Sequence, residues 1–308
     1  MTNIEDACVN SRFDKGDCLV SHLFKRFYTV LDKFVSLLTI SSIFIAITGS
    51  LLPYFSFLLY GVRVDFKLLL ASGLLTFTVY NLDKLTGIEE DLVNVPERAG
   101  FIEKNKKSVT FATIAAYIVA LFLSFLQNPF AIFIILFPFC IGIVYSIKIS
   151  NFRLKDITGI KNIVVALCWA VIGAFIPLAI SFRDFSVISL IFYFFFTKLF
   201  INTVLFDVRD IKGDKMNGVK TIPVVFGRKR TKNILLTLNS TLIPWLVYSY
   251  LSGCFHIYFI VLVFSIGHGY WYILYFCREE NTGKSLDLLV DGEWIPVVIL
   301  AAILTQFA

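Results

Sequence analysis

The chain has 308 residues, of which 57% are hydrophobic and only 16% are charged, and its mean hydropathy is +0.79. A typical soluble domain carries about 25% charged residues, so this composition excludes an ordinary soluble domain and predicts a polytopic membrane protein. The net charge of +6 gathers in a few loops. The six cysteines form no CxxC motif and no His/Cys cluster. We therefore expect reduced thiols rather than a zinc site or a disulfide framework.

The N-terminal arm, residues 1–34, precedes the first long apolar run. Residues 1–18 are polar and of mixed charge, which does not resemble a cleaved signal peptide. Over residues 19–34 the apolar side chains fall on one helical stripe, which predicts an interfacial helix on the membrane surface. A simple extension of the first membrane span is the alternative interpretation.

A spanning helix needs about 20 mainly apolar residues. Candidate runs cover residues 35–59, 65–84, 109–126, 129–147, 162–181, 185–206, 233–251, 254–276 and 293–307. They predict an all-α, polytopic fold of about nine transmembrane helices, arranged as two pseudo-repeated four-helix halves plus one. We expect a single transmembrane domain over residues 1–308. Each half places an acid-rich segment after its second helix, and parallel repeats of this kind usually put the working site between the halves.

Basic residues alternate between loops along the chain. The arm and the loops after the second, fourth and sixth runs are rich in Lys and Arg, whereas residues 127–129 and 252–253 contain neither. By the positive-inside rule, the N-terminus and the basic loops are cytoplasmic and the C-terminus is external. Both acid-rich segments would then face the cytoplasm.

The first acid-rich segment runs from Asn81 to Asp91. If it continues the second helix, Asp83 and Glu90 lie within ~20° of one another around the axis, and Asp91 is displaced by ~80°. The alternative is a set of solvated loop acids that pair with neighbouring Lys and Arg residues.

The second segment places Asp207, Asp210 and Asp214 on one helical stripe, provided that the helix persists past Gly213. Carboxylates that crowd at one membrane face predict a hard divalent cation between them, with Mg²⁺ as the leading candidate. Basic residues are interleaved with the acids in both loops: Lys84, Arg98, Arg209, Lys212, Lys215 and Lys220. Such a set suits a metal–diphosphate, although the positive-inside signal alone also explains basic residues there.

These residues resemble a known family. Arg209-Asp-Ile-Lys-Gly-Asp214, followed by Gly218, Thr221 and Pro223, is similar to the second signature of the UbiA superfamily of intramembrane prenyltransferases. The stretch from Asp91 to Arg98 is similar to the end of the first signature, and Tyr145-Ser146 with Arg153-Leu154-Lys155 is similar to a further family stretch. There is one departure, because Gly87 stands where the family usually has an Asp.

The resemblance implies transfer of a prenyl group from an isoprenyl diphosphate to an acceptor, with Mg²⁺ as cofactor. It implies metal ligands among Asp83, Glu90, Asp91, Asp207, Asp210 and Asp214. The resemblance also implies that the substrate-binding residues are Asn81, Lys84, Arg98, Lys155, Lys212 and Lys215. The catalytic residues would be Tyr145, Asp210 and Asp214.

Expected partners are an isoprenyl diphosphate, with geranylgeranyl diphosphate as one candidate, a hydrophobic acceptor and the lipid bilayer, but no nucleic acid. The acceptor stays open between an aromatic ring and a glycerol-phosphate lipid. A cation-coupled transporter with acidic ion sites is the alternative function, but it predicts ionisable residues near the middle of the bilayer. A phosphatidyltransferase of the CDP-alcohol type is a third interpretation, and its D-G-x-x-A-R signature is absent from the chain.

Three weaker features remain. Asp287, Asp291 and Glu293 repeat the acidic spacing without the Gly, Thr and Pro that follow the second segment, and we expect them in a solvated loop. His268 is expected to be a packed or hydrogen-bonded helix residue. Lys198 lies within a predicted span, where an ammonium group needs a partner or a cavity.

Overall fold

The computed structural model describes residues 26, 36–146, 158–216, 218–278 and 283–306. Every regular element within these ranges is a helix, which confirms the predicted all-α class for the described residues. The chain divides into two units, Met1–Ser41 and Ser42–Ala308. The interfacial helix predicted over residues 19–34 lies outside the described residues except for Arg26, which is helical.

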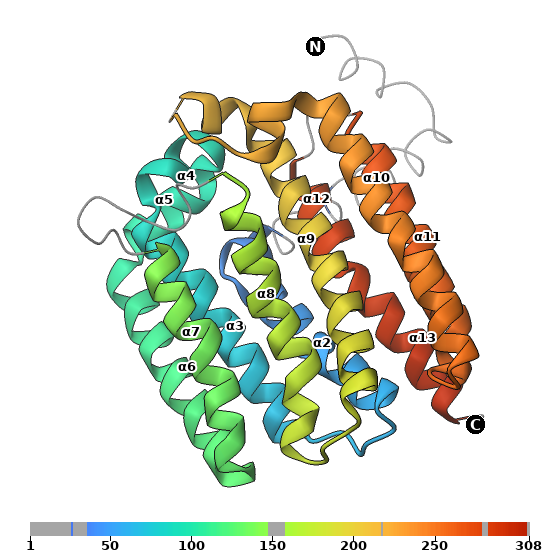
Figure 1. The fold of residues 1–308 in the computed structure, drawn as a ribbon. Helices are drawn as coiled ribbons and strands as arrows, with labels where there is room; N and C mark the ends of the chain where they lie inside the picture. Colours follow the sequence, from blue (N-terminus) through green and yellow to red (C-terminus); the bar gives the residue numbers. More distant parts are fainter. Residues whose placement is uncertain (1–25, 27–35, 147–157, 217, 279–282, 307–308) are drawn as a thin grey trace, which may run out of the picture. The chain divides into compact units, whose positions relative to one another are not determined.

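The long helices of the unit Ser42–Ala308 run side by side (Figure 1). The α-helices are α2 (Ile43–Leu59), α3 (Phe66–Thr86), α4 (Ile88–Asn94), α5 (Pro96–Lys104), α6 (Lys106–Gln127), α7 (Pro129–Ser146), α8 (Ile160–Phe175), α9 (Phe185–Met216), α10 (Ile222–Leu251), α11 (Phe259–Phe276), α12 (Gly283–Val290) and α13 (Trp294–Gln306). The short 3-10 helices are η3 (Ile176–Ala179), η4 (His256–Tyr258) and η5 (Asp291–Glu293).

Six helical stretches in the described part of the chain are long and apolar enough to cross a membrane, by length and composition. They are Lys106–Gln127, Ile160–Ala179, Phe185–Met216, Ile222–Leu251, His256–Phe276 and Leu286–Gln306. Two shorter apolar helices cover Ile43–Leu59 and Pro129–Val144. A multi-pass membrane protein is therefore confirmed, whereas the count of nine transmembrane helices stays a prediction.

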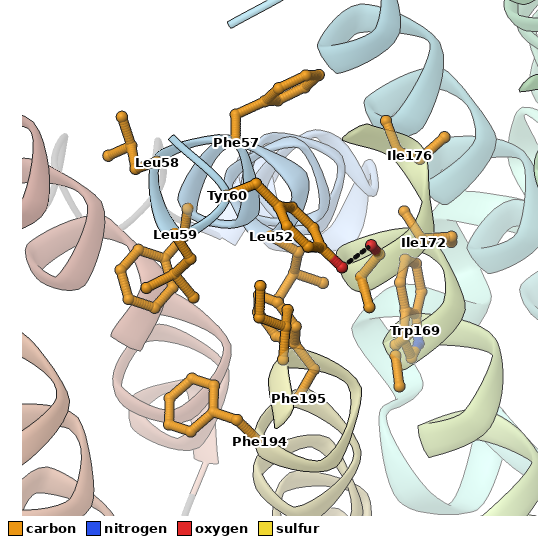
Figure 2. Packing of buried hydrophobic residues seen from close by; sticks show 14 of the residues in the cluster. Leu52, Phe57, Leu58, Leu59, Tyr60, Trp169, Ile172, Ile176, Phe194 and Phe195 are labelled. Atoms are coloured by element: carbon orange, nitrogen blue, oxygen red, sulfur yellow. Dashed lines mark hydrogen bonds between the residues drawn. The ribbon is translucent and has the colours of Figure 1, made fainter. Parts of the chain in front are cut away.

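Aromatic rings fill the core where α2, α8 and α9 meet (Figure 2). Phe55 packs edge-to-face against Phe194 and Phe195, with ring centroids 6.3 and 6.4 Å apart. Just after α2, the hydroxyl of Tyr60 donates a hydrogen bond to the backbone carbonyl of Ala174 on α8, at 2.9 Å. A buried hydroxyl needs such a partner because no water reaches it. The core thus fixes α2 against the helices that carry the second acid-rich segment.

Two glycines allow α2 and α3 to approach closely. A Cβ atom at Gly49 would lie 2.2 Å from Oγ1 of Thr76, and one at Gly73 would lie 2.3 Å from Oγ of Ser50. Small residues at helix contacts let backbones pack tightly within membranes, where packing rather than burial from water drives association. This contact places the end of α3, with its acid-rich segment, next to the start of α2.

The first acid-rich segment does not form one continuous helix. Helix α3 ends at Thr86, Gly87 has non-helical angles (φ −109°, ψ 23°), and α4 begins at Ile88. The shared stripe of Asp83 and Glu90 required one continuous helix, and this condition is not met, because the helix breaks at Gly87, a residue of low helix propensity. Helix α9, in contrast, persists through Gly213 to Met216, as the stripe in the second segment requires.

Candidate active site

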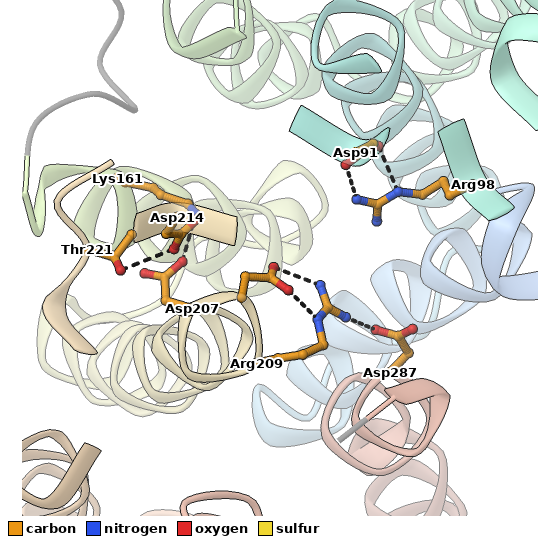
Figure 3. A network of polar contacts seen from close by, with 9 residues as sticks. Asp91, Arg98, Lys161, Asp207, Arg209, Asp214, Thr221 and Asp287 are labelled. Atoms are coloured by element: carbon orange, nitrogen blue, oxygen red, sulfur yellow. Dashed lines mark hydrogen bonds and ion pairs between the residues drawn. The ribbon is translucent and has the colours of Figure 1, made fainter. Parts of the chain in front are cut away.

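Asp207 anchors a polar site between α9 and α8 (Figure 3). Its side chain is 1% exposed, and its carboxylate accepts hydrogen bonds from Nζ of Lys161 at 2.7 Å and from Nδ2 of Asn162 at 2.8 Å. The other amide atom, Oδ1 of Asn162, is buried without a hydrogen-bond partner. Helix α8 therefore brings a cation and an unused oxygen acceptor to the second acid-rich segment. Sequence reasoning did not single out either α8 residue as a site residue.

Asp214 lies on the same face of α9, seven residues after Asp207 and ~20° from it around the axis. Its side chain is buried, and it accepts a hydrogen bond from Oγ1 of Thr221 at 3.2 Å. Thr221 is the N-cap residue of α10. The Asp, Gly and Thr of the signature thus belong to one local structure that joins the end of α9 to the start of α10.

Asp210 is held by its neighbour in the chain. Arg209 donates hydrogen bonds to both carboxylate oxygens of Asp210, from Nε at 2.7 Å and from Nη2 at 3.0 Å. The remaining nitrogen, Nη1, donates to Oδ1 of Asp287 on α12 at 3.1 Å (Figure 3). The guanidinium of Arg209 therefore joins the second acid-rich segment to α12.

In the first segment, Asp91 of α4 and Arg98 of α5 form a two-point ion pair (Figure 3). Nε of Arg98 donates to Oδ2 of Asp91 at 2.8 Å, and Nη2 makes a second contact with Oδ1. Helix α4 packs against α9, and Arg98 and Lys84 interact electrostatically with Asp287. The two acid-rich segments thus lie at the same end of the unit, and Asp287 of α12 interacts with basic residues of both.

Asn81 and Lys84 are buried on α3 and both contact the start of α2. Oγ of Ser42 donates a hydrogen bond to Oδ1 of Asn81 at 2.9 Å, and Nζ of Lys84 donates to Oγ of Ser42 at 2.7 Å. Asp83, on the same helix, is partly exposed.

The remaining predicted residues are placed as follows. Lys212 and Lys215 are exposed and line a pocket with Arg209 and Arg228 rather than the face of α9 that carries Asp207. Tyr145 belongs to the last turn of α7 and Glu90 to α4, but the side chains of both lie outside the described part. Lys155 lies outside the described residues altogether.

Asp287, Asp291 and Glu293 form a third acidic stretch, and the expectation that they lie in a solvated loop is wrong. Residues 283–293 form α12 and η5, and Glu293 is buried against Lys198 of α9, with 2.9 Å between Oε2 and Nζ. Oδ1 of Asp291 accepts a hydrogen bond from Asn202 at 2.9 Å. Asp291 and Glu293 contact α9 because the polar side chains of α9 need partners where water is absent. The sequence pointed to this contact through Lys198, because a lysine within a predicted membrane span needs a partner or a cavity.

His268 is packed within α11, as expected. Its ring stacks between Phe264 and Trp271, and Nδ1 lies 3.6 Å from Oε2 of Glu293. The buried side chains of Lys198 and Glu293 thus form one polar group with the partly exposed His268 and with the ring of Tyr272, which lies 4.9 Å from Nζ of Lys198.

The residues around Asp207 fit a hard cation. Within the described ranges, no three His, Cys, Asp or Glu side chains gather into a ready-made metal site. Mg²⁺ at phosphate sites, however, usually takes only one or two carboxylates and completes its shell with phosphate oxygens and water. Asp207, Asp214 and the unpartnered Oδ1 of Asn162 are oxygen donors of the required kind.

Comparison with solved structures supports this fold. A UbiA homologue from Archaeoglobus fulgidus bound to GPP and Mg²⁺ superposes with a TM-score of 0.66 at 18% identity, covering 87% of this chain and 96% of that one.

Comparison with curated sequences leads to the same group of proteins. The digeranylgeranylglyceryl phosphate synthase of Saccharolobus solfataricus is 30% identical over 200 residues, which cover 63% of this chain and 68% of the relative. The protein of the same name from Methanosphaera stadtmanae is 22% identical over 203 residues, which cover 64% of this chain and 71% of the relative. The model of the UbiA prenyltransferase family matches residues 103–289, which span more than half of the chain and include the second signature. The chain therefore belongs to the UbiA prenyltransferase family.

Proposed function

We propose that this prenyltransferase moves a prenyl group from an isoprenyl diphosphate to a hydrophobic, lipid-like acceptor and releases diphosphate, with Mg²⁺ as cofactor. The observation that carries the proposal is the group formed by the buried side chains of Asp207, Asp214 and Asn162 and the half-buried Lys161, at one end of apolar helices. A prenyl tail dissolves among such helices, whereas a diphosphate needs cations and hydrogen-bond donors. The site offers both within one helical unit.

In this proposal, Asp207 and Asp214 hold Mg²⁺ together with Oδ1 of Asn162. The bound ion would neutralise charge on the diphosphate. Lys161 and Arg98 supply further positive charge for the phosphate oxygens. Both already pair with acids of the site, so binding of a diphosphate and a cation can exchange these pairs without burying an unpaired charge.

Among the acids of the first segment, Asp91 is the proposed additional ligand, with Asp83 and Glu90 as further candidates. Asp210 is proposed to act at the same site, where Arg209 orients its carboxylate through two hydrogen bonds. We retain Asn81 and Lys84 as proposed contacts to the substrate, and Lys155 as a proposed contact to the diphosphate.

The proposed reaction breaks the bond between the allylic carbon and the diphosphate oxygen, and the diphosphate leaves with the electron pair. Positive charge around the leaving group favours this cleavage, because groups that are already oriented need no reorganisation when charge develops. The apolar helices exclude water from the allylic cation. The ring of Tyr145 is proposed to stabilise that cation. The acceptor then forms the new bond and loses a proton.

For the acceptor we propose a glyceryl phosphate lipid, and for the donor geranylgeranyl diphosphate. The support is that relatives from two organisms are named digeranylgeranylglyceryl phosphate synthase. Purified enzyme is to be assayed with radiolabelled geranyl, farnesyl and geranylgeranyl diphosphates, each with a prenylated glyceryl phosphate and with an aromatic acid. Transfer to the aromatic acid alone would contradict the proposed acceptor and leave the proposed reaction class standing.

We also propose that the site faces the cytoplasm and that residues 1–34 form a cytoplasmic arm of a single transmembrane domain over residues 1–308. The basic loops at that end support this orientation. In a background whose six native cysteines are replaced by serine, a cysteine introduced at Lys107 should react with a membrane-impermeant maleimide only after the cells are opened. One introduced at Ser252 should react in intact cells. The reverse pattern would contradict the orientation.

The role of Asp207 is tested by Asp207→Asn, which keeps the shape of the side chain and removes its charge. We expect at least about a hundredfold loss of diphosphate release, the scale on which one well-placed charged group in an active site acts. Asp184→Asn, at the exposed start of α9, is the matched control and should keep full activity. Diphosphate binding by the wild type should also be lost in EDTA. Full activity of Asp207→Asn would refute the proposed site.

A further inference from the structure

A basic pocket lies between the end of α9 and the start of α10. Its volume is about 340 Å³, at the lower end of the range of small-molecule sites. Its charged lining residues are Arg209, Lys212, Lys215 and Arg228, and none of the described residues that line it is Asp or Glu. A pocket with cations and no carboxylate is suited to an anion and unsuited to a metal ion.

This pocket lies on a different face of α9 from the site around Asp207. At 100° per residue, Lys212 and Lys215 lie ~140° and ~80° around the axis from Asp207. The acid face turns toward Lys161 of α8, whereas the pocket borders the first residues of α10. Two anion-binding positions can therefore be occupied at the same end of the protein, and Arg209, which lines the pocket and holds Asp210, adjoins both.

The positive charge of the pocket comes mainly from Lys212 and Lys215. Arg209 is hydrogen-bonded to Asp210 and Asp287, so its charge is already balanced. Lys212 and Lys215 have no ion pair among the described residues and lie exposed at the rim. Arg228 follows Gly227, whose left-handed angles (φ 77°, ψ 157°) kink α10 at the pocket wall. Such angles strain any residue with a Cβ, which makes glycine suited to the kink.

Exposed apolar side chains flank this basic pocket. Met216 follows Lys215 at the end of α9 and is 76% exposed, and Val225 and Phe226 precede Gly227 and are 52% and 46% exposed. A soluble anion would gain nothing from these side chains. A lipid would place its phosphate among the cations and its chain against the apolar residues, as at other membrane interfaces.

We propose that this pocket binds the head-group phosphate of a glycerolipid, at a position separate from the diphosphate site. The lipid is either one of the bilayer or a phosphate-bearing acceptor, because both present the same chemistry. The inference stands on the pocket and its apolar rim, and it does not require that the proposed acceptor be correct.

The test measures binding to the full-length protein in a neutral detergent, with EDTA present so that the metal-dependent site stays empty. The probes are dioctanoyl phosphatidic acid, dioctanoylglycerol and inorganic phosphate. The variant is Lys212→Gln with Lys215→Gln, two exposed positions that line the pocket. We expect the affinity for phosphatidic acid to fall about tenfold or more, since each cation near a membrane surface contributes about 1 kcal/mol. Dioctanoylglycerol should not bind measurably.

The matched control is Lys106→Gln with Lys107→Gln, which removes two exposed charges at the start of α6. It should bind phosphatidic acid like the wild type. If both double variants lose the same affinity for phosphatidic acid, the binding depends on unspecific surface charge, and the proposal is overturned. It is also overturned if the protein binds inorganic phosphate as tightly as it binds phosphatidic acid. Failure of the diphosphate site would appear separately, as diphosphate binding that EDTA does not affect.

A final comparison identifies the source of the lipid. A glyceryl phosphate with one prenyl chain is used as substrate for the pocket variant. A raised KM for this acceptor, with an unchanged KM for the prenyl diphosphate, assigns the pocket to the acceptor. Unchanged KM values, with the loss of phosphatidic acid binding, assign it to a bilayer lipid.

Discussion

The ion pair of Lys198 and Glu293 should behave as one unit when either partner is removed. Their side chains are 0% and 1% exposed, and 2.9 Å separates Nζ from Oε2. In Glu293→Leu the ammonium would keep, among the described residues, only the carbonyl of Ser265, at 2.9 Å, and the ring of Tyr272. An uncompensated buried charge costs about 3–5 kcal/mol. We therefore expect Glu293→Leu to lower the free energy of unfolding by about 3 kcal/mol or more.

The double variant Lys198→Met with Glu293→Leu should recover most of that loss, because an apolar pair of similar volume is often as stable as a buried ion pair. The measurement is reversible unfolding in mixed micelles with increasing dodecyl sulfate, followed as a double-mutant cycle. Arg183→Gln with Asp184→Asn, both exposed before α9, gives the control cycle, with coupling near zero. A loss under about 1 kcal/mol in Glu293→Leu would refute the reasoning.

Two further predictions concern packing and the site. Gly49→Ala should lower the free energy of unfolding by about 1–3 kcal/mol, because its Cβ would lie 2.2 Å from Oγ1 of Thr76, whereas Gly267→Ala, with nothing within 4 Å, should not. Thermal unfolding measures both, and equal stability of the two variants would contradict the close helix approach. Asn162→Leu should weaken Mg²⁺-dependent diphosphate binding about tenfold, because the side chain can no longer donate to Asp207. If calorimetry shows that Asn162→Leu binds diphosphate as tightly as the wild type, that role of Asn162 is excluded.

The helices could be predicted better than their ends. The last span, predicted over residues 293–307, corresponds to α13 (Trp294–Gln306). Helix α9 continues ten residues beyond its predicted end at 206, and α10 begins at Ile222 rather than at 233. Apolar length reports the thickness of the membrane, whereas a helix continues through Lys, Arg and Asp residues as long as its backbone hydrogen bonds form.

The site was only partly accessible to sequence reasoning. The spacing of Asp207 and Asp214 places both on one face of any helix, so the sequence alone was enough for that relation. The partners of Asp207 could not be predicted in this way, because Lys161 and Asn162 come from a helix that lies about 45 residues earlier in the chain. Which helix packs against α9 depends on side-chain shape along the whole interface. No local pattern carries that information.

The acids of the third acidic stretch are partners for the polar residues on one face of α9. Lys198, Asn202 and Arg209 lie within ~40° on one face of α9, and Asp207 lies ~180° from Lys198 on the opposite face. Glu293, Asp291 and Asp287 neutralise or hydrogen-bond the first face in that order. The C-terminal acids therefore act as counter-charges for α9, and they leave the opposite face with the carboxylates that the proposed reaction requires.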